Sequence, residues 1–313
     1  MKQIIFNVGG ALSSYIEFEG KKLLIDVAQG NSFNPVVDFL IPLFEKRKEK
    51  KNGNEKYNID QLVVSHPHKD HISAIGDLDS HFHVGLLTTP NDNVGMPDGH
   101  KINWKLIGNE KDSSLKVLRN MLKDRTPPLT VLSKNNQQIY YLAPEIDVEQ
   151  DAELKNESYI NNISIAVMLM INKYNIFMPG DLQKLGMKKL IESNPDLQKK
   201  LEKGIDVMIA SHHGLKSSFS TLLFEKMKNK KTRSIHVISE KQNNTEESRD
   251  VDTRYSSSDY CSGKNNLSGG NGVDECYQVK TSRGHILIDY YYSDYPRIDI
   301  ISDTSLLVDK FVE

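Results

Sequence analysis

Four potential metal ligands lie within one short stretch of this sequence, and that stretch limits the fold more than any other feature. The four are His66, His68, Asp70 and His71. The apolar, β-branched segment 61–64 comes directly before them and is typical of a buried strand. The ligands therefore lie where a strand ends and the chain turns toward a helix, which is where open α/β folds place their functional groups.

The spacing of these four residues predicts two metal sites that share one loop. His66 and His68 are two residues apart, so their side chains point the same way in an extended segment. Asp70 and His71 follow after the turn and can face a second point in space. One such histidine alone is consistent with an ordinary core or surface residue. That alternative does not explain four in the order H-x-H-x-D-H, because a buried polar side chain needs a partner and an exposed one gains nothing.

Composition indicates a globular protein and argues against general binding to nucleic acid or membrane, a disulfide framework and a thiolate cluster. The chain has 313 residues, 38% of them hydrophobic and 26% charged, as in ordinary globular domains. A formal net charge of −2 gives no general attraction to nucleic acid or membrane, so a local field, such as that of bound ions, must attract any anionic substrate. Two cysteines, Cys261 and Cys276, are too few for a disulfide framework or a thiolate cluster.

The sequence also predicts a soluble, cytoplasmic protein with no membrane partner. No stretch approaches the roughly 20 apolar residues of a membrane span. The apolar run at the N-terminus is too short for a signal peptide.

Two further strands are expected to end in metal-binding side chains. The buried strand 174–178 runs into Asp181, and a later buried strand ends at His212 and His213. For Asp181 alone, the alternative is a helix N-cap. Nitrogen and oxygen ligands at separate strand ends suit two divalent metal ions, with Zn²⁺ expected and Mn²⁺ as an alternative.

Residues Ser65 to His71 resemble the signature of the metallo-β-lactamase superfamily of metallohydrolases. Their surroundings look closest to the soluble hydrolase domain of ComEC-type competence proteins. Further matching features are Asn7–Gly10, the hairpin 15–26, Leu-Ala-Pro at 142–144, Gly180-Asp181 and His-His-Gly at 212–214. The resemblance implies a mixed α/β (α+β) fold, the four-layer αββα metallo-β-lactamase-like sandwich. It would form one domain over residues 1–313, with a flexible polar insertion at about 240–275.

The same resemblance assigns roles to the candidate residues. Asp181 would bridge two ions, of which the first is also bound by His66 and His68. The second would be bound by Asp70, His71 and a late histidine. His212 is the expected ligand and His213 the near alternative, since the sequence does not separate them. Asp26 and Asn162 would support the ligands without binding metal; for Asp26, a strand-end turn cap is the equal alternative.

Two departures from the family pattern bear on the site. Many superfamily members have a third histidine for the first ion where this chain has Asn161 and Asn162. ComEC-like proteins also carry asparagine there, and the first site is then expected to be weaker and completed by water. In addition, Arg254-Tyr255-Ser256-Ser257 stands where ComEC-like domains often have Arg-Tyr-Gly-His-Pro, so that histidine is absent.

The expected chemistry is hydrolysis by a metal-bound hydroxide, because zinc lowers the pKa of bound water toward roughly 7. Asp70 would orient this nucleophile, and His213 or Lys216 would stabilise developing negative charge. The resemblance implies a phosphodiester substrate, either a nucleotide or a nucleic acid. Lys69, Lys216 and Arg254 are candidate phosphate contacts, with ordinary surface charges as the alternative.

Two other functions remain open on the sequence. One is hydrolysis of a non-phosphate ester, a lactone or a thioester on the same centre. The other is a catalytically weak metal-binding partner protein. The sequence does not indicate a protein partner or an oligomeric state.

Patterns elsewhere predict the remaining elements. These are a strand at 3–8, a helix at 34–51, a loop at 77–101 containing the low-ranked metal candidates His81, His83 and His100, a helix at 110–124, two strands within 129–144, a polar loop at 145–160, a strand at 161–170, a helix at 182–193 and a closing hairpin at 277–281 and 284–288.

Overall fold

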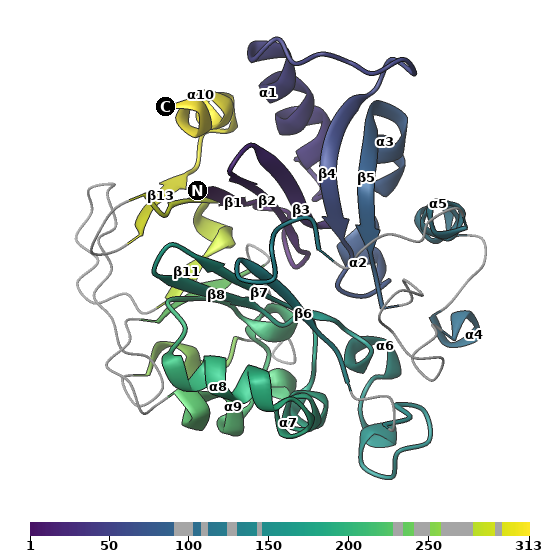
Figure 1. Cartoon of the computed structure of the whole chain (residues 1–313), viewed down its shortest axis with the longest axis vertical. Coiled ribbons are helices and arrows are strands. Elements are labelled where there is room, and N and C mark those ends of the chain that lie inside the picture. Colours follow the sequence, from purple (N-terminus) through teal and green to yellow (C-terminus); the bar gives the residue numbers. More distant parts are fainter. Residues whose placement is uncertain are drawn as a thin grey trace.

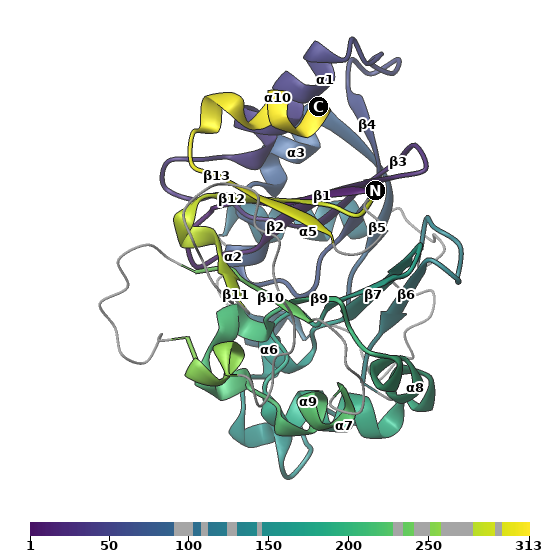
Figure 2. The same cartoon turned by 90° about the vertical axis from the view of Figure 1, so that its left-hand side faces the viewer.

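Two β-sheets face each other, and helices cover their outer faces (Figures 1 and 2). The computed structural model describes residues 1–90, 103–107, 112–123, 130–142, 146–227, 234–240, 251–257, 278–291 and 296–313. The mixed α/β sandwich expected from the sequence is confirmed by this arrangement.

The first sheet has seven strands within the described residues, in the order β13-β12-β1-β2-β3-β4-β5. Their bounds are β1 Lys2–Ile5, β2 Ser13–Phe18, β3 Lys21–Val27, β4 Tyr57–Val63, β5 Phe82–Thr88, β12 His285–Asp289 and β13 Arg297–Ile301. Neighbours from β13 to β3 pair antiparallel, whereas β3, β4 and β5 run parallel. The parallel strands β3 and β4 therefore end on the same side of the sheet.

The second sheet has six strands in the described part of the chain, in the order β11-β10-β9-β8-β7-β6. Their bounds are β6 Gln137–Tyr140, β7 Ala166–Ile171, β8 Tyr174–Met178, β9 Val207–Ile209, β10 Ile235–Ile238 and β11 Gln278–Lys280. Strands β8 to β11 are parallel and β6 to β8 antiparallel. Thus β8 and β9 also end together.

Alternate side chains of each sheet form the layer between the sheets. Ile16 and Ile25 of the first sheet belong to the same buried cluster as Val167 and Ile176 of the second. The neighbouring residues on these strands, such as Tyr15 and Leu24, pack instead against helices. This period of two is what a strand buried on both faces requires.

Helices pack on both outer faces, as Figure 2 shows. The first sheet is covered by the π-helical turn Pro35–Leu40, α1 Ile41–Lys46, α3 Ile75–His81 and α10 Leu307–Val312. The second is covered by α7 Lys184–Ser193, α8 Pro195–Lys203 and α9 Thr221–Met227. Shorter or peripheral helices are α2 Lys69–Ile72, α4 Trp104–Ile107, α5 Ser113–Leu122 and α6 Tyr159–Asn162. None of the helices in the described ranges has the length and apolar character that crossing a bilayer demands.

Several predicted elements are wrong within the described residues. The loop expected at 77–101 contains the end of α3 and the whole of β5. In β5, buried Phe82 and Val84 alternate with exposed His83 and Gly85, a strand pattern that the histidine and glycine obscure. Within 130–142, β6 is the one strand instead of two, and the helix expected at 34–51 ends at Lys46.

The strand expected to start at Asn161 starts instead at Ala166, because Asn161 and Asn162 end the short helix α6. The closing hairpin is also wrong. Strand β11 pairs with β10 in the second sheet, while β12 pairs with β1 in the first. Residues 241–250 and 258–275 of the predicted insertion, both cysteines and His100 lie outside the described residues.

Candidate metal centre

Strand ends from both sheets meet at one side of the sandwich. Strand β4 of the first sheet leads to Ser65 and His66, and β8 of the second leads to Asp181. A backbone bond from Ile165 N to Ser65 O (2.9 Å) ties the sheets together there. Ser164 Oγ accepts a hydrogen bond from Asp181 N at 3.1 Å. The carboxylate and the histidine loop are therefore held against each other by the backbone.

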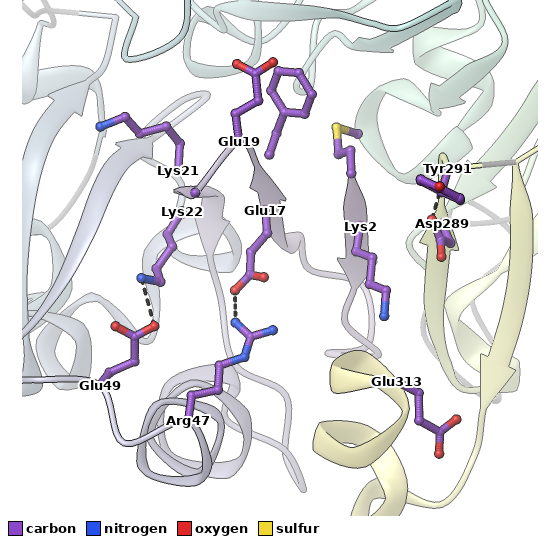
Figure 3. Close-up of a pocket in the computed structure, with 13 residues that line it drawn as sticks. Lys2, Glu17, Glu19, Lys21, Lys22, Arg47, Glu49, Asp289, Tyr291 and Glu313 are labelled. Atoms are coloured by element: carbon purple, nitrogen blue, oxygen red, sulfur yellow. Dashed lines mark hydrogen bonds and ion pairs between the residues drawn. The ribbon is translucent and has the colours of Figure 1, made fainter.

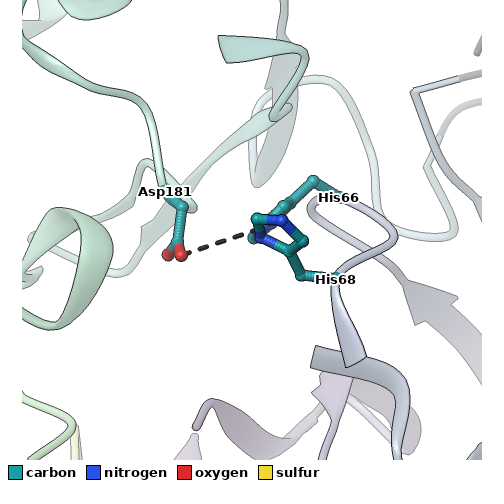
Figure 4. A group of neighbouring side chains, drawn as sticks. All are labelled: His66, His68 and Asp181. Atoms are coloured by element: carbon teal, nitrogen blue, oxygen red, sulfur yellow. Dashed lines mark hydrogen bonds and ion pairs between the residues drawn. The ribbon is translucent and has the colours of Figure 1, made fainter. Parts of the chain in front are cut away.

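The first group of possible ligands is His66, His68 and Asp181, which Figure 4 shows together. Nε2 of His66 lies 3.6 Å from Oδ2 of Asp181 and 2.9 Å from Nδ1 of His68. His66 is fully buried and Asp181 nearly so, whereas His68 is half-buried.

The second group is Asp70, His71 and His213. Nε2 of His213 lies 3.6 Å from Oδ2 of Asp70 and 3.7 Å from Oδ2 of Asp181. The same Asp181 oxygen is 3.3 Å from Nε2 of His71. One oxygen of Asp181 thus lies between both groups, the position of a bridging ligand.

The donor atoms fit a pair of divalent ions. Tetrahedral ligands around one zinc ion at its usual bond lengths lie roughly 3.3 Å apart, and the separations above fall on both sides of that value. Among the described residues, Nε2 of His71 and Nε2 of His213 are buried without a hydrogen bond. Unpaired buried nitrogens are rare because they are costly, and a metal ion would satisfy both.

Asp26 holds the loop that carries these histidines. Its Oδ1 accepts from Ser65 N and its Oδ2 from Ser65 Oγ, both at 2.7 Å. Oδ2 also lies 2.7 Å from Nδ1 of His71, so Nε2 of that ring is directed toward Asp181. Asp26 has a φ of 55°, a strained left-handed conformation typical of functional sites.

Most candidate ligands already have the ionisation state that a metal requires. Burial lowers the pKa of His66 and of His68, which keeps both rings neutral. Burial opposes ionisation of Asp181, but His71 and His213 hold its pKa well below the usual range. Burial also opposes ionisation of Asp70, but the neighbouring His213 and His71 lower its pKa below the usual range.

His71 is the exception. Burial disfavours its charged form, yet Asp181 and Asp26 together raise the pKa of His71 well above its usual value. A metal ion that binds Nε2 must therefore displace a proton from this ring.

The turn after β9 sends its two histidines in different directions. His212 and His213 both have left-handed backbones, with φ of 47° and 58°. His213 joins the second ligand group, whereas Nε2 of His212 lies 3.4 Å from Nδ2 of Asn161. The sequence favoured His212 as the ligand, and the structure brings its alternative, His213, to Asp70 and His71.

Two other predicted residues make contacts with residues outside the two ligand groups. Asn162 accepts from Gln183 N at 3.0 Å and donates to Glu157 at 2.9 Å, so it supports the start of α7. Arg254 is paired with Asp252 at 2.6 Å and lies 3.9 Å above the ring of Phe219.

Lys69 begins α2, and Lys216 begins a short 3₁₀ turn at Lys216–Ser218. His81 and His83 belong to neither ligand group and are exposed.

The supporting contacts of two residues, Ser164 and Gly180, were not predicted from the sequence. Ser164 holds Asp181 through the hydrogen bond above, and Gly180 has a φ of 61°. A Cβ on Gly180 would lie 3.0 Å from Cβ of Ser164 and 3.1 Å from Cβ of Ser65. No local pattern indicates these contacts, although a glycine before Asp181 is compatible with a left-handed backbone there.

An open cavity of about 670 Å³ lies at the opposite end of the first sheet, around the β2–β3 turn (Figure 3). Its walls are charged, and four of the charged residues form pairs: Lys22 with Glu49 at 3.0 Å, and Arg47 with Glu17. None of the candidate ligands lines it. The cavity is therefore separate from the metal centre.

A comparison with known protein families finds a match to part of the chain. Residues 6–145 match the sequence model of the Metallo-beta-lactamase superfamily. The sequence has no significant match among curated proteins.

Three solved structures are similar to this chain at low identity. The metallo-beta-lactamase fold protein YhfI from Bacillus subtilis is 13% identical, with 67% of this chain and 71% of that chain covered and a TM-score of 0.34. A diphosphatase from the PhnP family is 13% identical, with 77% and 87% covered and a TM-score of 0.36. The short form of human tRNase Z is 12% identical, with 77% and 93% covered and a TM-score of 0.32.

The matched segment contains β2 to β6 and the whole histidine loop, while Asp181 and His213 follow later strands of the second sheet. The match over residues 6–145 and the two facing sheets with helices outside identify the fold of this chain as that of the metallo-β-lactamase superfamily.

Proposed function

We propose that this chain is a metal-dependent phosphodiesterase or nuclease that uses two divalent ions, zinc or manganese. One observation carries the proposal. Oδ2 of Asp181 lies within 3.7 Å of Nε2 of His66, His71 and His213, so one carboxylate oxygen serves both ligand groups. A pair of ions bridged in this way is typical of enzymes that hydrolyse phosphate esters.

Each side chain has a distinct part in this proposal. Ions held by these residues would supply Lewis acidity, which would make a water nucleophilic near neutral pH and polarise a phosphoryl oxygen. His66 and His71 are fully buried and form the closed back of the site. The Asp70 side chain is 45% exposed, so substrate approaches from its side, and its ionised carboxylate can orient the attacking water.

The substrate class rests on the resemblance to ComEC-type hydrolase domains and on nearby positive charge. Lys69 precedes Asp70, and Lys216 follows His213 by three residues. Both can neutralise phosphate charge as the substrate approaches. We also propose that the chain folds as a single domain and acts in the cytoplasm.

Hydrolysis of bis-p-nitrophenyl phosphate with added Zn²⁺ or Mn²⁺ tests this function, with single-stranded DNA as the second substrate. Turnover should fall by roughly 100-fold or more in His68→Ala and Asp181→Ala. It should persist in Asp151→Asn, which changes a surface carboxylate paired with Lys189. A protein that binds its metals fully yet hydrolyses only carboxylic esters, lactones or thioesters, or nothing, would refute the proposal.

A further inference from the structure

His212 and Asn161 form a polar pair beside the two ligand groups, and neither residue belongs to either group. We propose that this pair binds a non-bridging oxygen of the substrate's phosphoryl group and stabilises its growing charge. The inference rests on the proposed hydrolase function. It assigns to these two residues a role in substrate binding that is separate from metal binding.

The backbone fixes His212 next to the strand end that carries Asp181. His212 N donates to Gly180 O at 3.2 Å, and Ser211 Oγ donates to Gly180 O and Leu182 O. The left-handed φ of 47° at His212 is unusual for a residue with a side chain. Such strain persists only where surrounding contacts enforce it, and it is common at functional sites.

Two hydroxyl groups set the orientation of the His212 ring. Nδ1 lies 3.1 Å from Oγ of Ser218 and 3.3 Å from Oγ of Ser217. Ser218 is buried, and its segment is tied down by the β-bridge between Leu215 and Val251. When a serine hydroxyl donates to Nδ1, the proton of the neutral ring is on Nε2. His212 then presents an N–H donor on the side facing Asn161.

A buried, unsatisfied polar group on Asn161 is separate evidence that a ligand binds beside His212. It is 3% exposed, and within the described residues its Oδ1 has no hydrogen-bond partner. Exchanging the two ends of the amide would pair Oδ1 with Nε2 of His212 but would leave the NH₂ end free. Because the proton of the neutral His212 ring is on Nε2, only this exchanged orientation avoids two donors facing each other. The buried NH₂ group that it leaves unpaired is a donor, which is costly unless water or an anionic oxygen binds there.

The pair is close enough to act on a substrate at the metal centre. The rings of His212 and His213 are 5.9 Å apart, and His213 contacts both Asp70 and Asp181. During phosphate ester hydrolysis the non-bridging oxygens carry charge. Donors that are fixed before the reaction stabilise this charge without reorganisation.

Metal content and phosphate affinity test the proposal without relying on turnover. The variants are His212→Ala and Asn161→Ala, with His212→Gln to retain an N–H donor and His83→Ala as a control that removes an exposed histidine. Each is loaded with Co²⁺, the ions per chain are counted, and inorganic phosphate is titrated by its effect on the cobalt absorption spectrum. Circular dichroism verifies the fold.

Both alanine variants should keep the cobalt content of the unaltered protein. They should weaken phosphate binding roughly tenfold, as expected for loss of a donor to a charged oxygen. His212→Gln should recover part of the affinity, and His83→Ala should match the unaltered protein. In the phosphodiester assay, kcat should fall more than KM rises, since the contact strengthens as charge develops.

Two results would overturn the inference. Loss of one cobalt ion in His212→Ala would make His212 a metal ligand. Phosphate affinity within twofold of the unaltered protein in both alanine variants would exclude the binding role. An unaltered protein that binds phosphate through His212 but hydrolyses no phosphodiester would instead refute the proposed activity, so the two failures are distinct.

Discussion

Nδ1 of His71 lies 2.7 Å from Oδ2 of Asp26, and both side chains are fully buried. The opposite nitrogen of the same ring is 3.3 Å from Asp181. The His71 ring therefore joins a residue at the end of β3 to the carboxylate that follows β8. A carboxylate that holds a histidine in this way fixes the ring orientation and makes the other nitrogen a stronger metal donor.

Replacing Asp26 with Asn should weaken metal binding by about 10-fold to 100-fold, because an amide orients and polarises His71 less than a carboxylate does. Competition with a chromophoric zinc chelator measures the change. Asp303→Asn is the control, since Asp303 is an exposed cap that accepts from Ser305. Equal zinc affinity in both variants would contradict the role given to Asp26.

Asp181→Asn should reduce the bound metal from two ions per chain to one or none. The amide retains one oxygen but loses the charge that two ions sharing a ligand require. Elemental analysis after dialysis gives the stoichiometry. Retention of two tightly bound ions would show that Asp181 does not bridge them.

Zinc binding should release about one proton per chain near pH 7, because His71 is protonated in the metal-free protein. Asp181 and Asp26 raise the pKa of His71 well above its usual value, against the effect of burial. Affinity should therefore rise about tenfold per pH unit until the pH reaches that pKa. Calorimetry in buffers of different ionisation enthalpy counts the protons, and identical heats in all buffers would rule out the release.

Gly180→Ala should destabilise the protein by roughly 1–3 kcal/mol and lower its metal affinity. The left-handed φ of 61° disfavours a side chain, and the new Cβ would press on Ser164 and Ser65. Gly76→Ala is the matched control, because a Cβ there meets nothing within 4 Å and helix α3 favours alanine. Urea unfolding compares them; a Gly180→Ala protein as stable as the control would contradict the argument.

Acid should destabilise the protein partly through His236. Burial lowers the pKa of His236 to about 4, while an unfolded histidine titrates near 6.5. The unfolded chain binds the extra proton between these values, so stability from His236 is present above pH 6.5 and is lost as pH falls toward 4. The total is roughly 3 kcal/mol.

His236→Gln should remove this part of the pH dependence, even though it is less stable at pH 7 because the bond from Nδ1 to Tyr255 O (2.9 Å) is disturbed. Unfolding free energies at pH 7, 5.5 and 4.5 give the slope. His83→Gln, which changes an exposed histidine, should keep the slope of the unaltered protein. If the unaltered protein, His236→Gln and His83→Gln all lose the same stability as the pH falls, His236 is not the cause.

Local sequence was enough to predict the strands that lead to the site. Strand β8 has the predicted bounds 174–178, and β4 precedes His66 as the apolar run indicated. These segments are buried and regular, so their hydrophobic pattern reports their conformation directly. Strand β5 was missed because its exposed positions are His83 and Gly85, which are not typical strand residues.

The order H-x-H-x-D-H also determined which side chains of one loop can bind metal, because ligand type and spacing are local properties. Only the tertiary structure decided which residues from other strands join them. His212 and His213 are adjacent in sequence, and the left-handed backbone at both positions directs one toward Asp181 and the other toward Asn161. The separation of β11 and β12 into different sheets was decided in the same way, since pairing between distant strands depends on the packed core and not on the residues of either strand alone.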